Sequence, residues 1–388
     1  MRDIGLAVRE LLTAEVRHAA EAWFGGQKSA ERLARAAWSV LTEPGDGVAG
    51  ELIASLGAED ALEAAARATR RPADSVALAD ATARWRPRWD AGLVEAALRQ
   101  GVRRDLQFVI PGDAGWCAAT DALGAHAPVG LWVRGDAAVL GRGGASVGVV
   151  GARAATPYGE LVTTDIASEL AADGAIIISG AAYGVDGAAH RAALRTSSPT
   201  VAFVAGGVDR VYPAGHAEML QRIAETGAIV AERPPGAAPT KWRFLARNRL
   251  IAAASAATVV VEAGVRSGSL NTANHAATLG RPLGAVPGPV TSSTSAGCHR
   301  LLREYGAVCI TSPDDVRELL GLGVDHPLET RGDPELTRVS DALARRTPRS
   351  IAEIARLSGL AEGSVIGALG LLALSGAAVE RNGGWEAG

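Results

Sequence analysis

Between Ser146 and Ser312, short runs of β-branched and other apolar residues alternate with Ala-rich stretches that have helical spacing. This alternation is typical of βαβ units, in which helices cover both faces of a parallel sheet. The pattern predicts an α/β fold with a doubly wound, mostly parallel sheet. The predicted strands are Val147–Val150, Ala175–Ser179, Val201–Ala205, Ala228–Ala231, Thr258–Val261, Leu283–Val286 and Val308–Thr311.

Two zones with a different pattern flank the predicted sheet. Residues 30–105 are rich in Ala, Leu and Arg at helical spacing, which predicts a small helical domain. Near the other end, a capping box from Ser350 to Glu353 opens a helix, and a second helix is expected from about Glu362 to Leu374. A hairpin turn at Asn382-Gly383 completes a predicted winged helix. The predicted domains are residues 1–105, 106–320 and 335–388, with a linker at 321–334.

Basic residues are clustered, without acidic ones, in one segment of the chain. The 388 residues include 39 basic and 42 acidic side chains, so attraction for nucleic acid has to be local. Phe244 lies three residues after Lys241, and a ring beside a cation allows a base to stack while the cation contacts a phosphate. The segment therefore predicts binding of single strands without sequence preference. Its five cationic side chains, with no acidic one between them, are Arg233, Lys241, Arg243, Arg247 and Arg249.

Small residues follow several predicted strands at the edge where parallel sheets bind ligands. Gly151 and Arg153 follow the first strand, Ser179-Gly180 the second, and Ser267-Gly268 the fifth. Small residues let backbone N–H groups approach a phosphate, and the helix N-termini beyond them carry partial positive charge. We expect Arg153 to contact a phosphate with both arms of its guanidinium.

The predicted winged helix differs, because Gly359 to Ala378 contains no Lys or Arg, which favours protein contacts over DNA contacts there.

Signatures of common catalytic and cofactor sites are missing from the sequence. It has neither G-x-x-x-x-G-K-[ST] nor G-x-G-x-x-G after a strand, so no ATP or NAD cofactor is expected. Asp186 and His190, four residues apart, are too few to hold a metal and favour a structural role. The cysteines Cys117, Cys298 and Cys309 match no zinc spacing and predict a reducing compartment. With no apolar run of about 18 residues, a cytoplasmic protein without membrane contact is expected.

Short motifs occur in a specific order along the central zone. They include Val149-Val-Gly-Ala-Arg153, Ser179-Gly-Ala-Ala-Tyr-Gly184-Val-Asp186, Phe244-Leu-Ala-Arg-Asn-Arg249, Val261-Glu262, Ser267-Gly-Ser-Leu270 and Gly297-Cys-His-Arg-Leu-Leu302. Together they resemble the DNA processing protein A family, also called DprA or Smf. The resemblance implies a Rossmann-like domain, with a small helical, SAM-like domain before it and a winged helix after it.

The resemblance also implies a function. Family members are non-catalytic homodimers that bind and protect single-stranded DNA and load the RecA recombinase on it during natural transformation. The family's phosphate-binding arginine falls on Arg153, its lysine on Lys241 and its base-stacking aromatic on Phe244. Two positions depart from the family pattern: Tyr183 replaces a basic residue, and Leu245 replaces a frequent proline. The expected nucleic-acid site comprises Gly151, Arg153, Ser179, Gly180, Tyr183, Lys241, Phe244, Arg247, Asn248, Arg249, Ser267 and Gly268.

Three other functions are weighed against this one. A nucleotide-cleaving phosphoribohydrolase of related fold needs a carboxylate after the glycine turn, but Leu270–Leu279 has none and Glu262 precedes the turn. A nuclease needs clustered carboxylates that hold divalent metal. An interaction scaffold predicts little salt dependence in any DNA binding. We expect no enzymatic activity, no cofactor and no metal.

Overall fold

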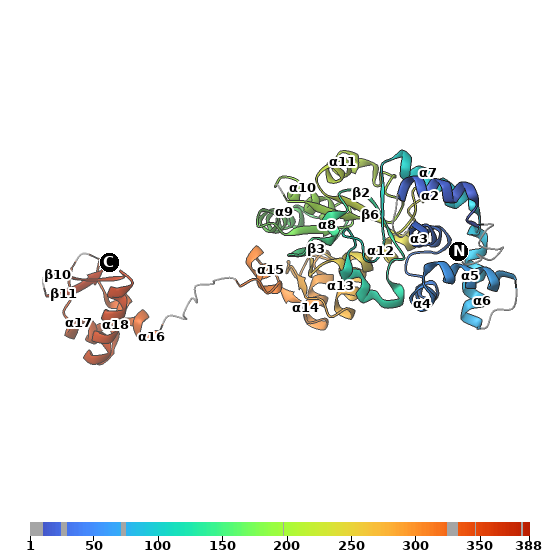
Figure 1. Ribbon diagram of the computed structural model, residues 1–388. Helices are drawn as coiled ribbons and strands as arrows, with labels where there is room; N and C mark the ends of the chain where they lie inside the picture. The colour runs from blue at the N-terminus through green and yellow to red at the C-terminus, as the bar shows by residue number, and fades with distance from the viewer. Residues whose placement is uncertain are drawn as a thin grey trace. The chain divides into compact units, whose positions relative to one another are not determined.

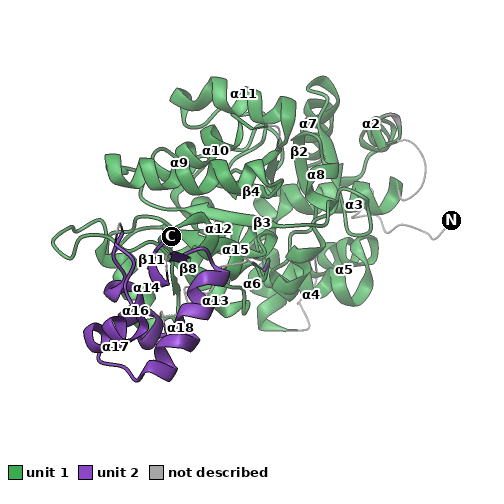
Figure 2. Ribbon diagram, turned by 90° about the vertical axis from the view of Figure 1, so that its left-hand side faces the viewer, with its two compact units in different colours: residues 1–322 green, residues 323–388 purple. Residues whose placement is uncertain are grey.

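The computed structural model describes residues 11–24, 29–70, 75–196, 198–323, 333–345, 347–381 and 383–388. The chain divides into two compact units, Met1–Leu322 and Gly323–Gly388 (Figures 1 and 2). Most of the linker predicted at 321–334 lies outside the described residues, as does Asn382 of the predicted hairpin turn.

A nine-stranded sheet, counted over the described residues, forms the centre of the first unit, in the order β1-β2-β6-β5-β4-β3-β7-β8-β9. Its parallel strands overlap the seven predicted ones: β3 (Ser146–Val150), β4 (Ile176–Ser179), β5 (Thr200–Phe203), β6 (Ala228–Ala231), β7 (Ala257–Val260), β8 (Leu283–Ala285) and β9 (Val308–Cys309). Beyond β6, β2 (Leu131–Gly135) and β1 (Gln107–Val109) add antiparallel strands that the sequence analysis did not predict. The prediction of a doubly wound, mostly parallel α/β sheet is confirmed.

The strand order reverses between β3 and β7. β3 pairs in parallel with β4 on one side and with β7 on the other. The chain builds β4, β5 and β6 outward from β3, then returns to add β7, β8 and β9 on the opposite side. In doubly wound sheets such a reversal leaves a crevice at the carboxyl ends of the two central strands. A ligand site is therefore expected just after Val150 and Val260.

Both faces of the central strands are covered by helices. Successive strand residues point to opposite faces, so Val147 and Val149 of β3 pack in one cluster with α9 (Pro157–Ala172) and α10 (Val185–Ala193). Val150 packs in another cluster with α12 (Lys241–Ala254) and α13 (Ser269–Thr278). Burial on both sides explains why these strands read as continuous apolar runs in the sequence.

Helices near the N-terminus lie beside the antiparallel edge of the sheet (Figure 1). They are α2 (Ala14–Phe24), α3 (Ser29–Leu41), α4 (Gly47–Leu56), α5 (Ala58–Arg70), α6 (Val76–Trp85) and α7 (Ala91–Arg103). The indole of Trp132 in β2 donates a hydrogen bond to the Ser39 hydroxyl of α3 at 3.1 Å. Trp132 and Trp38 belong to the same buried cluster, so these helices share a hydrophobic core with the sheet.

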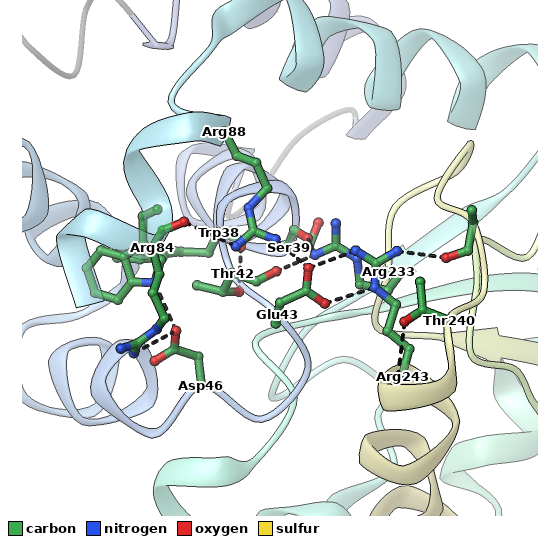
Figure 3. A network of polar contacts seen from close by, with 12 residues as sticks. Trp38, Ser39, Thr42, Glu43, Asp46, Arg84, Arg88, Arg233, Thr240 and Arg243 are labelled. Atoms are coloured by element: carbon green, nitrogen blue, oxygen red, sulfur yellow. Dashed lines mark hydrogen bonds and ion pairs between the residues drawn. The ribbon is translucent and has the colours of Figure 1, made fainter. Parts of the chain in front are cut away.

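An ion-pair network also ties these helices to the sheet domain (Figure 3). The Glu43 carboxylate, which follows α3, accepts hydrogen bonds from Arg243 of α12 at 2.7 and 2.8 Å and another from Arg88. Arg233, which follows β6, donates to the carbonyl oxygens of Ser39 and Thr42. Burial alone would raise the pKa of Glu43, but the hydrogen bonds from Arg243 and the nearby positive charges outweigh burial and lower that pKa to about 2. We call Glu43, Arg88, Arg233 and Arg243 the Glu43 network.

The second unit contains three helices and a two-stranded hairpin within its described residues. They are α16 (Pro334–Ala342), α17 (Ile351–Ser358), α18 (Glu362–Leu374), β10 (Ala378–Arg381) and β11 (Gly384–Ala387). The Ser350 hydroxyl caps α17 by accepting the N–H of Glu353, and Gly359 ends this helix in a left-handed conformation. No single described helix is long and apolar enough to cross a membrane, and one bent pair, α17 with α18 at 102°, meets the length and composition criteria only when its halves are combined.

Replacing Glu43 with Gln should destabilise the first unit by roughly 1–3 kcal/mol at pH 7, because it removes charged hydrogen bonds. The pKa of Glu43 is lower in the folded than in the unfolded chain, so its contribution is present above pH 4.5 and is lost as the pH falls toward 2. The difference in urea midpoint between the wild type and Glu43→Gln should therefore shrink over that range. Glu51→Gln, at an exposed position of α4, serves as the control. A difference that stays constant down to pH 3 contradicts the assignment.

Candidate nucleic-acid interface

A pocket of about 840 Å³ opens at the carboxyl ends of β3 and β7, where the strand order reverses. Its walls come from the loop after β3, the first turns of α12 and the loop between β7 and α13. These segments are far apart in the sequence, and the sheet brings them to one edge. The pocket gathers eight of the predicted site residues: Gly151, Arg153, Lys241, Phe244, Arg247, Asn248, Ser267 and Gly268.

The first turn of α12 positions the predicted lysine and aromatic residue. Thr240 caps this helix by accepting the N–H of Arg243 at 3.4 Å, so the helix begins at Lys241. Lys241 and Phe244 are three residues apart and lie on the same face. Lys241 is exposed, and no residue in the described part of the chain forms an ion pair with it. Leu245 is simply a helical residue here, so the departure from the family's proline leaves the turn intact.

Phe244 lies at the pocket and not in the core. Its ring is partly buried, and the Arg153 guanidinium lies 4.8 Å from the ring centroid. The ring of Tyr212 is 5.5 Å away, tilted by 48°. A guanidinium over an aromatic face is an attractive cation–π contact, which holds the exposed Arg153 side chain at the pocket. The structure thus places a cation and a ring together, although Arg153 lies in the loop after β3 and Phe244 in the first turn of α12.

Most of the basic segment, in contrast, is engaged inside the protein. Arg233 and Arg243 belong to the Glu43 network. Arg249 is 5% exposed and forms a bidentate pair with Glu232 at 2.6 and 2.7 Å. Arg249 also donates to the carbonyl oxygens of His126 and Ala246, and it does not line the pocket. The expectation that Arg249 contacts nucleic acid is therefore corrected, because a buried guanidinium requires a partner within the fold.

Arg247 lines the pocket but is only 6% exposed. Its guanidinium donates to the carbonyl oxygen of Phe203 and to the Asn248 side chain. Burial lowers the pKa of Arg247 to about 10, and the nearby Asp186 charge opposes this shift. A Cβ added at Gly180 would come within 2.3 Å of this guanidinium, so the packing of Arg247 favours glycine at position 180.

Two further predicted residues lie outside the pocket. The Ser179 side chain is fully buried and donates to the carbonyl oxygen of Val149 at 2.6 Å. Tyr183 is 49% exposed, and its hydroxyl accepts the N–H of Gly215 at 3.3 Å. Ser179 thus joins neighbouring strands, and Tyr183 contacts the loop before α11 (Ala217–Thr226).

The N-terminus of α9 is occupied by a side chain of the protein itself. Glu262, 2% exposed, accepts the N–H and the hydroxyl of Thr156 at 2.8 and 2.7 Å, and the hydroxyl of Thr294 at 3.1 Å. A phosphate at this helix end, as the sequence analysis expected, would have to displace a buried carboxylate. The N-terminus of α13 differs, since Gly268 has no side-chain cap and no atom lies within 4 Å of where its Cβ would be.

One cation of the pocket was not predicted from the sequence. Arg266, in the loop between β7 and α13, is exposed at the pocket edge, and no described residue pairs with it. Its position directly before Ser267-Gly268 was the available signal. Arg153, Lys241 and Arg266, which we call the three pocket cations, converge from three separate segments.

Asp186 and His190 are structural groups in this fold. Asp186 accepts the N–H of Ala182 at 3.3 Å, and burial raises its pKa. His190 Nδ1 is 2.8 Å from the Thr200 hydroxyl, and burial lowers the pKa of His190 to about 3, so the ring is neutral at pH 7. Among the residues that the structure describes, no group of three or more His, Cys, Asp or Glu side chains is arranged for a metal ion.

The chain is similar to known proteins over most of its length. The family of DNA recombination-mediator protein A matches residues 107–321. The chain is 42% identical over 369 residues to the putative DNA processing protein DprA of Mycobacterium tuberculosis, covering 90% of this chain and 93% of that protein. DNA processing protein DprA of Bacillus subtilis is 35% identical over 193 residues, 50% of this chain and 64% of that protein.

Two solved structures are also similar. DNA processing protein A of Streptococcus pneumoniae superposes with a TM-score of 0.61 at 29% identity, covering 75% of this chain and 96% of that one. DNA processing protein A of Helicobacter pylori, solved to study its single-stranded DNA binding mode, gives a TM-score of 0.50 at 32% identity, covering 56% and 97%. The chain therefore belongs to the DNA recombination-mediator protein A family.

Proposed function

We propose that this protein binds single-stranded DNA in the pocket between β3 and β7, without sequence preference and without cutting it. The observation that carries the proposal is the contact between Arg153 and Phe244, with the exposed Lys241 one helical turn before the ring. An unpaired nucleotide offers a flat base and a charged phosphate a few ångströms apart. A ring flanked by exposed cations complements both, and every base can stack on it.

The three pocket cations give the strand its electrostatic attraction. They surround a pocket whose other charged groups, Arg247 and Asp186, are buried close to one another. The N-termini of α12 and α13 also face the pocket and add partial positive charge. On a chain of net charge −3, this local concentration is what draws a polyanion to one edge of the sheet.

The geometry gives no support to a phosphoribohydrolase. Such an enzyme needs a carboxylate free to face the sugar. Both oxygens of Glu262 accept hydrogen bonds from Thr156 and Thr294, and Glu262 does not line the pocket. The Asp186 carboxyl lines the pocket but is buried, and burial raises its pKa.

Phe244→Ala should weaken binding of labelled oligothymidylate by about 1–3 kcal/mol, because it removes the stacking surface. Phe244→Tyr keeps the ring and should bind within about twofold of the wild type, a difference of less than roughly 0.5 kcal/mol. Fluorescence anisotropy titrations of the wild type and both variants measure these differences. Equal affinity of Phe244→Ala and the wild type would remove the ring from the proposed site.

Arg153→Ala, Lys241→Ala and Arg266→Ala should each lower the slope of log affinity against log salt by roughly 0.7 for each phosphate that the removed cation no longer neutralises. Phe244→Ala should leave that slope unchanged. Arg195→Ala is the matched control, since Arg195 is exposed and follows α10 at the opposite edge of the sheet. Salt slopes that are the same for the ring variant and the cation variants would contradict the separate roles given to them.

We further propose that the protein is a homodimer that passes its bound strand to RecA, and that the second unit is a winged helix making protein contacts. The family supports the first part, and the absence of Lys and Arg from α18 supports the second.

A chain ending at residue 322 should keep its oligothymidylate affinity and a dimeric mass by light scattering. Full-length protein on biotinylated oligothymidylate should retain RecA in a pull-down. A monomeric mass, a lost affinity or unretained RecA each contradicts the corresponding part.

A further inference from the structure

A second pocket, of about 500 Å³, lies on the other side of the first turn of α12. Trp242 lines it, together with Arg84, Arg88 and His126 from the N-terminal part of the unit. The Trp242 side chain is 63% exposed, whereas the other seven tryptophans, all within the described residues, are buried or partly buried. A large apolar ring left in solvent beside cations is unusual enough to require an explanation.

The first turn of α12 contributes to both pockets, with Lys241 and Phe244 lining the first and Trp242 the second. With 3.6 residues per turn, Trp242 and Phe244 project from nearly opposite sides of the helix. Lys241 and Leu245 lie between them on the solvent side, and both are exposed. A chain that leaves the first pocket across this turn therefore passes Lys241 and then meets the indole of Trp242.

Three acidic side chains, Glu43, Asp46 and Glu51, line the second pocket together with Arg84 and Arg88. The Glu43 carboxylate is held by Arg88 and Arg243 (Figure 3). Asp46 caps α4 through the N–H of Ala49 and accepts the indole N–H of Trp85 at 2.9 Å. Arg84 is 3.6 Å from Asp46, and its side chain is 53% exposed. Glu43 and Asp46 are thus engaged in the fold, and the exposed groups beside the pocket include the Trp242 indole, the Arg84 guanidinium and the Glu51 carboxylate.

We propose that Trp242 is a second stacking site for the same single strand, with Arg84 contacting a phosphate beside it. The inference rests on the proposed function and extends it, since it gives the strand a direction from the β3/β7 edge toward the N-terminal helices. The ring and the cation repeat the chemistry of Phe244 and its neighbours, with one position of α12 between the two aromatic residues.

Oligothymidylates of two lengths separate this inference from the proposed function. A strand of about 4 nucleotides fills the first pocket alone, and one of about 12 reaches both. Trp242→Ala should leave the affinity for the short strand unchanged and lower that for the long strand roughly 5- to 100-fold. Trp242→Phe, the matched control, should restore the long-strand affinity. Arg84→Ala should lower the salt slope for the long strand only.

Tryptophan fluorescence provides an independent readout. Stacking on the exposed indole should quench the emission of the wild type with the long strand, and Trp242→Phe should abolish the quench while keeping the affinity. If the wild type binds both strands and Trp242→Ala loses nothing on the long one, or if the quench survives in Trp242→Phe, this inference is overturned alone. If the wild type binds neither strand, the proposed function fails and this inference fails with it.

Discussion

A charged side chain cannot be buried without a partner except at a large cost, and this constraint decides which cations of the chain can reach a ligand. Arg249 is buried against Glu232, Arg243 is held by Glu43, and Arg247 lies between the Phe203 carbonyl oxygen and Asp186. The basic appearance of residues 233–249 therefore reflects how α12 is anchored. Within that segment Lys241 remains exposed at the crevice, where it lies with Arg153 and Arg266.

The first turn of α12 combines anchoring and recognition within four residues. Arg243 points into the Glu43 network, while Lys241 and Phe244 line the main pocket and Trp242 lines the second one. The Thr240 cap fixes where this turn starts, and the network fixes it against the N-terminal helices. A ligand that contacts Lys241 and Phe244 thus meets side chains on a backbone already fixed in place, which reduces the ordering cost of binding.

The sequence predicted the parallel strands, which depend on local patterns. It did not predict strand pairings and ion pairs that depend on residues elsewhere in the chain. Runs such as Ile176–Ser179 are buried on both faces, as is typical of a covered parallel strand. Leu131–Gly135 carries a similar run, but its pairing with β6 and the burial of Trp132 against α3 are set by residues far along the chain. Arg153, Lys241 and Phe244 line the crevice as expected. Arg249 does not, because it is buried against Glu232, which lies 17 residues earlier in the chain. Arg266 was overlooked because only the small residues that follow it, Ser267 and Gly268, were considered in that turn.

The most direct test of the proposed mode of binding is a crystal structure of the full chain with an oligothymidylate. We expect phosphate oxygens about 3 Å from Lys241 and Arg153, as in charge-assisted hydrogen bonds, and an intact strand with one base stacked on Phe244. A strand bound elsewhere, such as on the second unit, with Arg153 still over Phe244 and no nucleotide between β3 and β7, would contradict the proposed mode of binding.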